Sequence, residues 1–212
     1  MDLTRKRLCF SKKGILKFVG HLDFLRVFGE MLQRSRLPVG YSAGFNPHIL
    51  LSFALPLPLG FESENDYADL VFAEDLPEDV ILHRINEAAP RGLYVKSAYS
   101  VTDKCASIVA AADYSYKNQR ASESQILQEL SKNQIIVPKK TKSGLRNTDI
   151  RPDIFSVTLS DGMVHMRLSA GSARFLHPLA AAESLFGEKP SPNGFTRIEM
   201  FKQTDTGSFA RL

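Results

Sequence analysis

The sequence has little cysteine, and none in a metal-binding pattern. Cys9 and Cys105 are its two cysteines, and there is no CxxC, no CxxxCxxC and no Cys/His cluster with zinc-finger spacing. A bound iron–sulfur cluster or a structural zinc is therefore not expected, and we predict no metal and no cofactor. Isolated thiols usually behave as small buried side chains, which is what we expect of Cys9.

Long apolar segments are absent as well. The longest, residues 49–61, is interrupted by Ser52, Pro56 and Pro58 and is shorter than the ~20 residues of a membrane-spanning helix. The N-terminal segment MDLTRKRLCF lacks the apolar core and cleavage site of a secretory signal. We therefore expect a cytoplasmic protein without a membrane partner.

Motifs of common catalytic mechanisms are also missing. The chain has no GxSxG nucleophile elbow and no phosphate-binding GxxxxGK[ST] loop. His21 and Asp23 are the one short pair of metal-ligand types, but they are two residues apart on a predicted helix and point in different directions. These absences favour a role other than catalysis.

Charge is concentrated in three segments, although the net charge of the 212 residues is only +4. Residues 1–36 contain nine Lys and Arg against three acidic residues, and residues 132–151 contain six against one. Residues 62–90 contain nine acidic residues against one Arg. This segregation predicts a dipolar surface that attracts a polyanion, unless folding interleaves the segments into ordinary solvated faces.

The first half of the chain predicts a β-α-β-β-α-β order. Alternating side chains indicate a strand at residues 5–10, and helical spacing indicates a helix at residues 21–34, with His21 on the side of Leu25 and Phe28. Further strands are expected at residues 49–54, 67–73 and 93–101, and a second helix begins at Pro77.

The second half repeats this order. It is expected to contain a strand at residues 112–117, a helix capped by Ser122, a strand at residues 134–140 leading into a basic loop, a hairpin across Asp161-Gly162, a helix at residues 178–186 and a strand at residues 195–203. The fold class predicted is therefore α+β, a tandem ferredoxin-like protein made of two β-α-β-β-α-β modules with antiparallel sheets. The expected domains are residues 1–102 and 110–205, followed by a tail at 206–212.

Basic side chains of both halves are candidates for RNA binding. If folding brings them onto one surface, each could neutralise a phosphate. The candidates are Arg5, Arg7, Lys12, Lys13, Arg34, Arg36, Lys139, Lys140 and Lys142.

The segment YSAGFNPH is the candidate loop site. Gly44 permits unusual backbone angles and Pro47 stiffens the chain, so polar groups of the loop could converge at a sheet edge. The candidate site residues are Tyr41, Ser42, Gly44, Phe45, Asn46 and His48. The alternative is a purely structural turn, with Asn46 bonded to its own backbone.

Several blocks of the sequence resemble those of a known protein family. FSKKGILKFVGHLDFLRVF and LPVGYSAGFNPHILLSFALPLPLGFESENDYADL are similar to the opening of the radical-SAM-linked bacterial domain family of unknown function, as a stand-alone member. DIRPDI and GSARFLHP extend the resemblance into the second half, although Arg174-Phe175 stands where the family often has Arg-Pro. The resemblance implies an accessory role beside a radical SAM enzyme and a link to RNA processing. The cluster-bearing chemistry would come from the partner.

Three hypotheses follow. The leading one is an RNA-binding or substrate-presenting accessory protein, with an RNA such as tRNA and a radical SAM enzyme as partners. The second is a metal-independent endoribonuclease, in which His21 or His48 acts as general acid/base and Lys12, Lys13 or Tyr41 stabilises the transition state. The third is a protein–protein adaptor that uses the YSAGFNPH loop.

Overall fold

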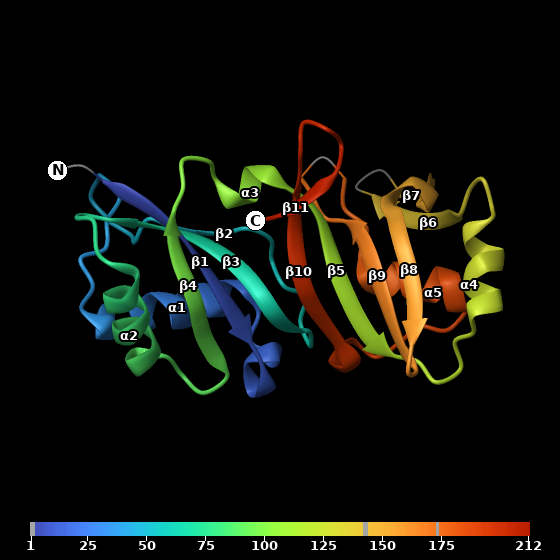
Figure 1. The fold of residues 1–212 in the computed structure, drawn as a ribbon, viewed down its shortest axis with the longest axis horizontal. Helices are drawn as coiled ribbons and strands as arrows, with labels where there is room; N and C mark the ends of the chain where they lie inside the picture. Colours follow the sequence, from blue (N-terminus) through green and yellow to red (C-terminus); the bar gives the residue numbers. More distant parts are fainter. Residues whose placement is uncertain (1–2, 142–143, 173) are drawn as a thin grey trace.

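The structure is a computed structural model that describes residues 3–141, 144–172 and 174–212. The predicted α+β class is confirmed: one large, mostly antiparallel sheet dominates the molecule (Figure 1). Along the main path its strand order is β4-β1-β3-β10-β5-β9-β8, with β2 added to β3 and β11 added to β10. The strands of this sheet are β1 (Thr4–Lys12), β2 (Leu51–Phe53), β3 (Glu62–Phe72), β4 (Leu93–Ser100), β5 (Val109–Lys117), β8 (Ile154–Ser160), β9 (Met163–Ser169), β10 (Phe195–Gln203) and β11 (Phe209–Arg211).

Four α-helices lie at the expected positions, and the described residues also form the short α3 and three 3-10 turns. The α-helices are α1 (His21–Ser35), α2 (Glu78–Ala88), α3 (Cys105–Ile108), α4 (Glu123–Leu130) and α5 (Pro178–Phe186), and the 3-10 turns are η1 (Gly14–Phe18), η2 (Arg151–Asp153) and η3 (Pro192–Gly194). Ser122 caps α4 as predicted, because its hydroxyl accepts a hydrogen bond from the Gln125 amide. The single turn of α3 was not predicted from the sequence.

The two halves have the same strand arrangement. The first half runs β4-β1-β3-β2 and the second β10-β5-β9-β8, and each half presents its strands in the same chain order. A parallel contact joins the halves, where Thr196 and Arg197 of β10 lie opposite Glu62 and Ser63 of β3. The sheet is therefore continuous across the junction.

Two segments of the chain differ from the predicted secondary structure. The segment expected to lead into a loop forms a separate hairpin of β6 (Ile136–Thr141) and β7 (Gly144–Asp149). The segment expected as a tail includes β11, which pairs with β10. The hairpin between β8 and β9 is confirmed, since both Asp161 and Gly162 have the left-handed backbone that a tight turn requires.

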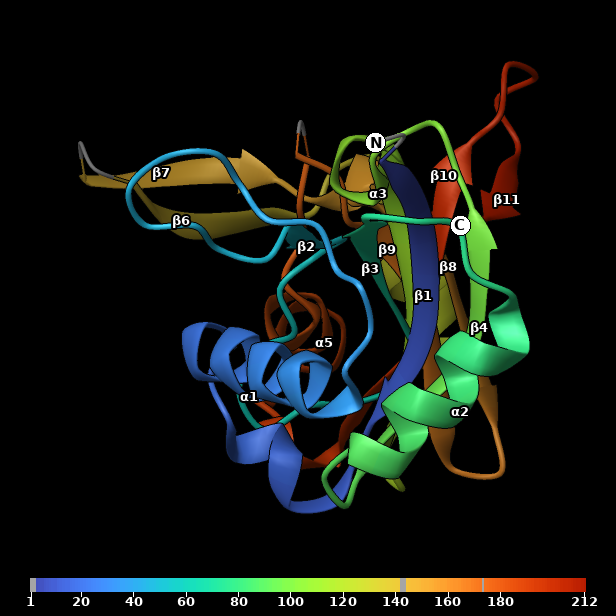
Figure 2. The same cartoon turned by 90° about the vertical axis from the view of Figure 1, so that its left-hand side faces the viewer.

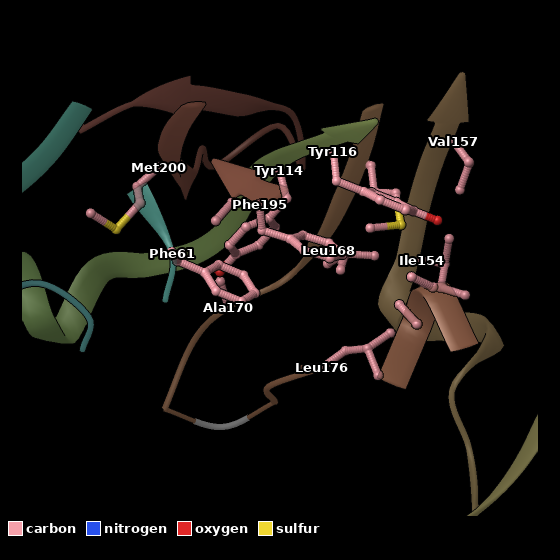
Figure 3. Close-up of a cluster of buried hydrophobic side chains, with 14 of the residues drawn as sticks. Phe61, Tyr114, Tyr116, Ile154, Val157, Leu168, Ala170, Leu176, Phe195 and Met200 are labelled. Carbon is pink, nitrogen blue, oxygen red and sulfur yellow. The ribbon is translucent and has the colours of Figure 1, made fainter. Parts of the chain in front are cut away.

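The hydrophobic side chains form two clusters. In the first half, Leu8 and Phe10 of β1 pack against Phe28 of α1 and Ile85 of α2. The second cluster includes strand residues together with Ile126 of α4 and Leu185 of α5, and Figure 3 shows part of it. Phe61, from the first half, inserts there and stacks on Phe195, with ring centroids 4.8 Å apart. The halves therefore share buried surface.

The opposite face of the sheet carries charged pairs together with aromatic rings such as Phe201 and Phe209. In Figure 2, α1, α5 and the β6–β7 hairpin stand on one side of the sheet. Alternation puts charged residues on the other side, where Arg7 pairs with Asp69 and Arg167 pairs with Asp113. No helix in the described part of the chain is long and apolar enough to cross a membrane.

Candidate functional site

The loop of residues 41–48 is closed by its own hydrogen bonds. The Ser42 amide donates to the His48 carbonyl at 2.9 Å, and the His48 amide donates to Ser42 Oγ at 3.1 Å. Ser42 Oγ also lies 2.8 Å from His48 Nδ1. Gly44, with φ +120°, allows the chain to reverse at the tip. This closure holds the loop as an ordered projection from the fold.

The loop presents two aromatic rings to solvent. Phe45 at the tip is fully exposed, and Tyr41 is 50% exposed. Most other phenylalanine side chains, such as Phe10 and Phe28, are buried in the clusters described above. Exposed rings on an ordered loop are available to stack on a ligand.

A groove of about 610 Å³ separates this loop from α1. Its α1 side consists of one helical face, which carries Leu25, Gly29 and Gln33. Its loop side carries Tyr41 and His48. The remaining lining residues are Arg26, Glu30, Pro47, Ile49 and Leu51. Figure 2 shows the segment between α1 and β2 arching over α1 on the helix-bearing side of the sheet.

Arg26 is exposed and lines this groove, whereas Arg34 and Arg36 are exposed but do not line it. Arg34 donates to the Ala88 carbonyl of α2 at 3.0 Å. Arg26 pairs with Asp23 at 3.1 Å, and such an exposed pair is weak, so the Arg26 guanidinium can turn to an anionic ligand. The groove is thus bordered by the rings of Tyr41 and His48 and by the opposite charges of Arg26 and Glu30.

Lys12 and His21 lie together in a different and nearly closed hollow. Lys12 is buried, donates to the Val19 carbonyl at 2.8 Å and lies 4.4 Å from the centre of the Phe24 ring. Burial lowers the pKa of Lys12 to about 8. Burial, and then the charge of Lys12, lower the pKa of His21. The hollow measures about 10 Å³, which is at most the space of one water molecule and far too small for a phosphodiester.

The candidate catalytic residues therefore do not converge on one cleft. Lys12 and His21 line the small hollow, whereas Tyr41 and His48 line the groove on α1. Lys13 is partly exposed and pairs with Glu64 at 2.6 Å.

Two of the candidate RNA-binding residues lie inside the protein, which corrects their expected place on the surface. Arg7 is 2% exposed and bonds Asp69 and Asp103, each at 2.9 Å. Lys12 is equally buried, as described above. Arg5 is half-buried and donates to the Thr102 carbonyl at 3.1 Å. Neither Arg7 nor Lys12 is available to a phosphate.

Antiparallel pairing of strands explains why several of these basic side chains are buried or paired with acidic residues. β1 carries several bases of residues 1–36, β3 carries several acids of residues 62–90, and the two strands are neighbours. Three ion pairs join these segments through β3: Arg7–Asp69, Lys13–Glu64 and Lys17–Glu62. α1 itself adds no net charge, because Asp23 and Glu30 balance Arg26 and Arg34, and Arg36 follows its C-terminus.

The second basic segment lies elsewhere. Lys139 and Lys140 belong to β6, and Lys142 lies outside the described residues. The β6–β7 hairpin and α1 stand on the same side of the sheet (Figure 2) but are well separated along its length (Figure 1). The two basic segments therefore do not merge into one continuous patch.

The α1 side of the groove was missed by the sequence reasoning. Leu25, Gly29 and Gln33 follow one another at intervals of four, so helical periodicity alone places them on one face. The sequence contains no signal that the loop of residues 41–48 returns over this face.

Comparison with known families gives one match. The family described as "Uncharacterized protein conserved in bacteria (DUF2344)" matches residues 5–178. The matched region contains α1, the loop of residues 41–48 and both halves of the large sheet except β10 and β11. No curated protein matches the chain.

Proposed function

The chain belongs to this bacterial DUF2344 family, and we propose that it is an RNA-binding or substrate-presenting accessory protein. In this proposal, a single-stranded RNA segment binds in the groove between α1 and the loop of residues 41–48. The radical-SAM-linked resemblance adds a radical SAM enzyme as the proposed protein partner and an RNA such as tRNA as the proposed ligand. We also propose that the two halves are ferredoxin-like modules, because each has the same strand order.

The observation that carries the proposal is an exposed ring and an exposed guanidinium group on the two sides of one groove. Tyr41 on the loop side and Phe45 at the nearby loop tip offer faces on which unpaired bases can stack, and Arg26 lines the α1 side of the groove. Stacking on aromatic side chains together with phosphate contacts from arginine is how proteins hold single-stranded nucleic acid. A rigid duplex keeps its bases stacked inside and does not offer them to these rings.

The test is RNA binding measured by fluorescence anisotropy, with a mixed-sequence single strand and with tRNA. We expect wild-type protein to bind, with an affinity that falls steeply as salt is raised. The Tyr41→Ala/Phe45→Ala double variant should bind at least about 30-fold more weakly, because it removes two stacked bases that contribute roughly 1–3 kcal/mol each. Tyr94→Ala removes an equally exposed tyrosine from β4 and is the matched control. Salt-independent titrations, or equal binding by the double variant, would overturn the proposal.

A cleaving activity is the second candidate, and one contact favours it. Ser42 Oγ engages His48 Nδ1, which leaves Nε2 as the ring nitrogen to face a ligand in the groove. A histidine oriented in this way could act as general acid/base in metal-independent RNA cleavage. His21 does not fit this role, because its hollow excludes a phosphodiester. Gel analysis of labelled RNA separates the candidates: cleavage that His48→Ala abolishes supports the enzyme, whereas binding without cleavage in both proteins supports the accessory role.

The adaptor hypothesis makes a different prediction for the same loop. If the loop of residues 41–48 contacts a partner protein, the Tyr41→Ala/Phe45→Ala variant should lose that partner while its RNA affinity is unchanged.

A further inference from the structure

A second hollow adjoins the groove on α1. It measures about 590 Å³ and lies between the segment of residues 48–52 and α3. His48, Ile49 and Leu51 line both hollows. The segment that leads into β2 is therefore a narrow ridge with a hollow on each side.

The chemistry of the second hollow differs from that of the first. Lys104 is exposed at its border, and the Arg5 guanidinium contributes a second positive charge. Its hydroxyl groups come from Ser52, Ser107 and Ser172. No aromatic side chain lines it apart from His48. Cationic and hydroxyl groups are those that bind phosphate and sugar oxygens.

Among the described residues, Asp69 is the one acidic residue that lines this hollow, and its charge is already matched. Arg7 Nε lies 2.9 Å from Asp69 Oδ1, and the Cys105 amide donates to Asp69 Oδ2 at 2.6 Å. Asp69 is also 3% exposed, so it presents little surface to a ligand. The charge that the hollow offers to solvent is therefore positive.

We propose that the RNA strand crosses this ridge and occupies both hollows. This inference rests on the proposed function and specifies its ligand as single-stranded RNA long enough to pass from α1 to α3. Bases stack on Tyr41 in the first hollow and on Phe45 at the exposed tip of the loop, and phosphates of the following nucleotides lie beside Lys104 and the serine hydroxyls in the second hollow. A flexible single strand can bend across the ridge, whereas a duplex, with a persistence length of about 150 base pairs, cannot.

The test compares oligouridylates of about 3 and about 10 nucleotides on wild-type protein and on Lys104→Glu. Lys104 is exposed, and within the described part of the chain its ammonium group makes no hydrogen bond that holds the fold, so the variant should fold normally. The longer RNA should bind Lys104→Glu about 10-fold more weakly than wild type, with a salt slope lower by about one. The shorter RNA should bind both proteins equally. Lys189→Glu, an exposed change of the same charge after α5, is the matched control and should bind both RNAs as wild type does.

Crosslinking gives an independent readout. A 4-thiouridine oligonucleotide of the longer length should crosslink to peptides that contain Tyr41 or Phe45 and to peptides that contain Lys104 or Ser107. If both RNAs bind wild type and Lys104→Glu equally, or if crosslinks are confined to the loop of residues 41–48, the path across the ridge is refuted and the RNA-binding function stands. If no RNA binds to wild-type protein, the proposed function fails, and the path fails with it.

Discussion

Arg197 and Asp66 form a buried ion pair across the junction between the two halves of the protein. Arg197 is fully buried, and its Nε donates to Asp66 Oδ1 at 2.8 Å. The same guanidinium donates to the carbonyls of Leu55 and Pro56, at 3.0 and 3.3 Å. One side chain of β10 thus holds both β3 and the segment that follows β2. Because the charge is buried and fully engaged, it fixes how the halves meet.

Removing this guanidinium should be strongly destabilising. Arg197→Met leaves the Asp66 carboxylate buried without its partner, a change that typically costs about 3–5 kcal/mol. Urea denaturation should therefore show a large loss in the free energy of unfolding. Arg120→Met breaks an exposed pair with Glu188 and should cost less than about 1 kcal/mol. If Arg197→Met is too unstable to purify, Arg197→Lys keeps the charge and should show an intermediate loss. Stability within about 1 kcal/mol of wild type for Arg197→Met would contradict this account.

Lys12 should make stability depend on pH in the alkaline range. Its pKa falls from 10.5 in the unfolded chain to about 8 in the folded protein because the ammonium group is buried. Below about pH 8 the charged group carries the full cost of burial, and that cost disappears as pH rises toward 10.5. Wild type should therefore gain stability relative to Lys12→Met as pH rises from about 7 to about 10, by roughly 1.4 kcal/mol for each unit of pKa shift. Urea titrations of both proteins at the two pH values measure this difference. A difference that stays constant with pH would show that Lys12 is not desolvated.

The two cysteines should be inert toward thiol reagents in the folded protein. Burial is the main reason that the pKa of Cys9 rises to about 11 and that of Cys105 to about 12. Thiolate is the reactive form, and both side chains are also shielded from the reagent. At about pH 8, Ellman's reagent should label neither thiol in native protein and both in urea. Rapid labelling of one thiol without denaturant would mean that β1, which carries Cys9, or α3, which carries Cys105, opens readily.

Replacing Gly92 or Gly29 by alanine should change the stability of the protein in opposite directions. Gly92 has φ +95°, and an added Cβ would lie 2.4 Å from the Lys13 carbonyl oxygen, so Gly92→Ala should lower the melting temperature. Gly29 lies inside α1 with no heavy atom within 4 Å of an added Cβ. Gly29→Ala should therefore stabilise the protein by about 0.5–1 kcal/mol, because alanine loses less backbone entropy in a helix. Calorimetry should show a lower melting temperature for Gly92→Ala and a higher one for Gly29→Ala. A lower melting temperature for Gly29→Ala would show that α1 needs a glycine at the groove.

Local patterns in the sequence were enough to predict the α+β class and most elements. The alternation in β1, the helical spacing in α1, the Ser122 cap of α4 and the Asp161-Gly162 turn each depend on neighbouring residues, and the structure confirms all four. Local patterns missed β7, α3 and β11, since these short elements owe their conformation to what they pair with or pack against.

At the candidate site, too, some properties depend on the local sequence and others on tertiary contacts. The sequence by itself determined that residues 41–48 form a glycine-containing polar loop with aromatic residues, and that residues 1–36 are rich in bases. The tertiary structure alone decided which of those bases reach solvent, because the antiparallel neighbours β1 and β3 pair Arg7 with Asp69 inside the protein and leave Arg26 exposed on α1. It alone decided that His21 and His48 lie in different hollows, because burial and strand pairing depend on contacts between residues far apart in the chain.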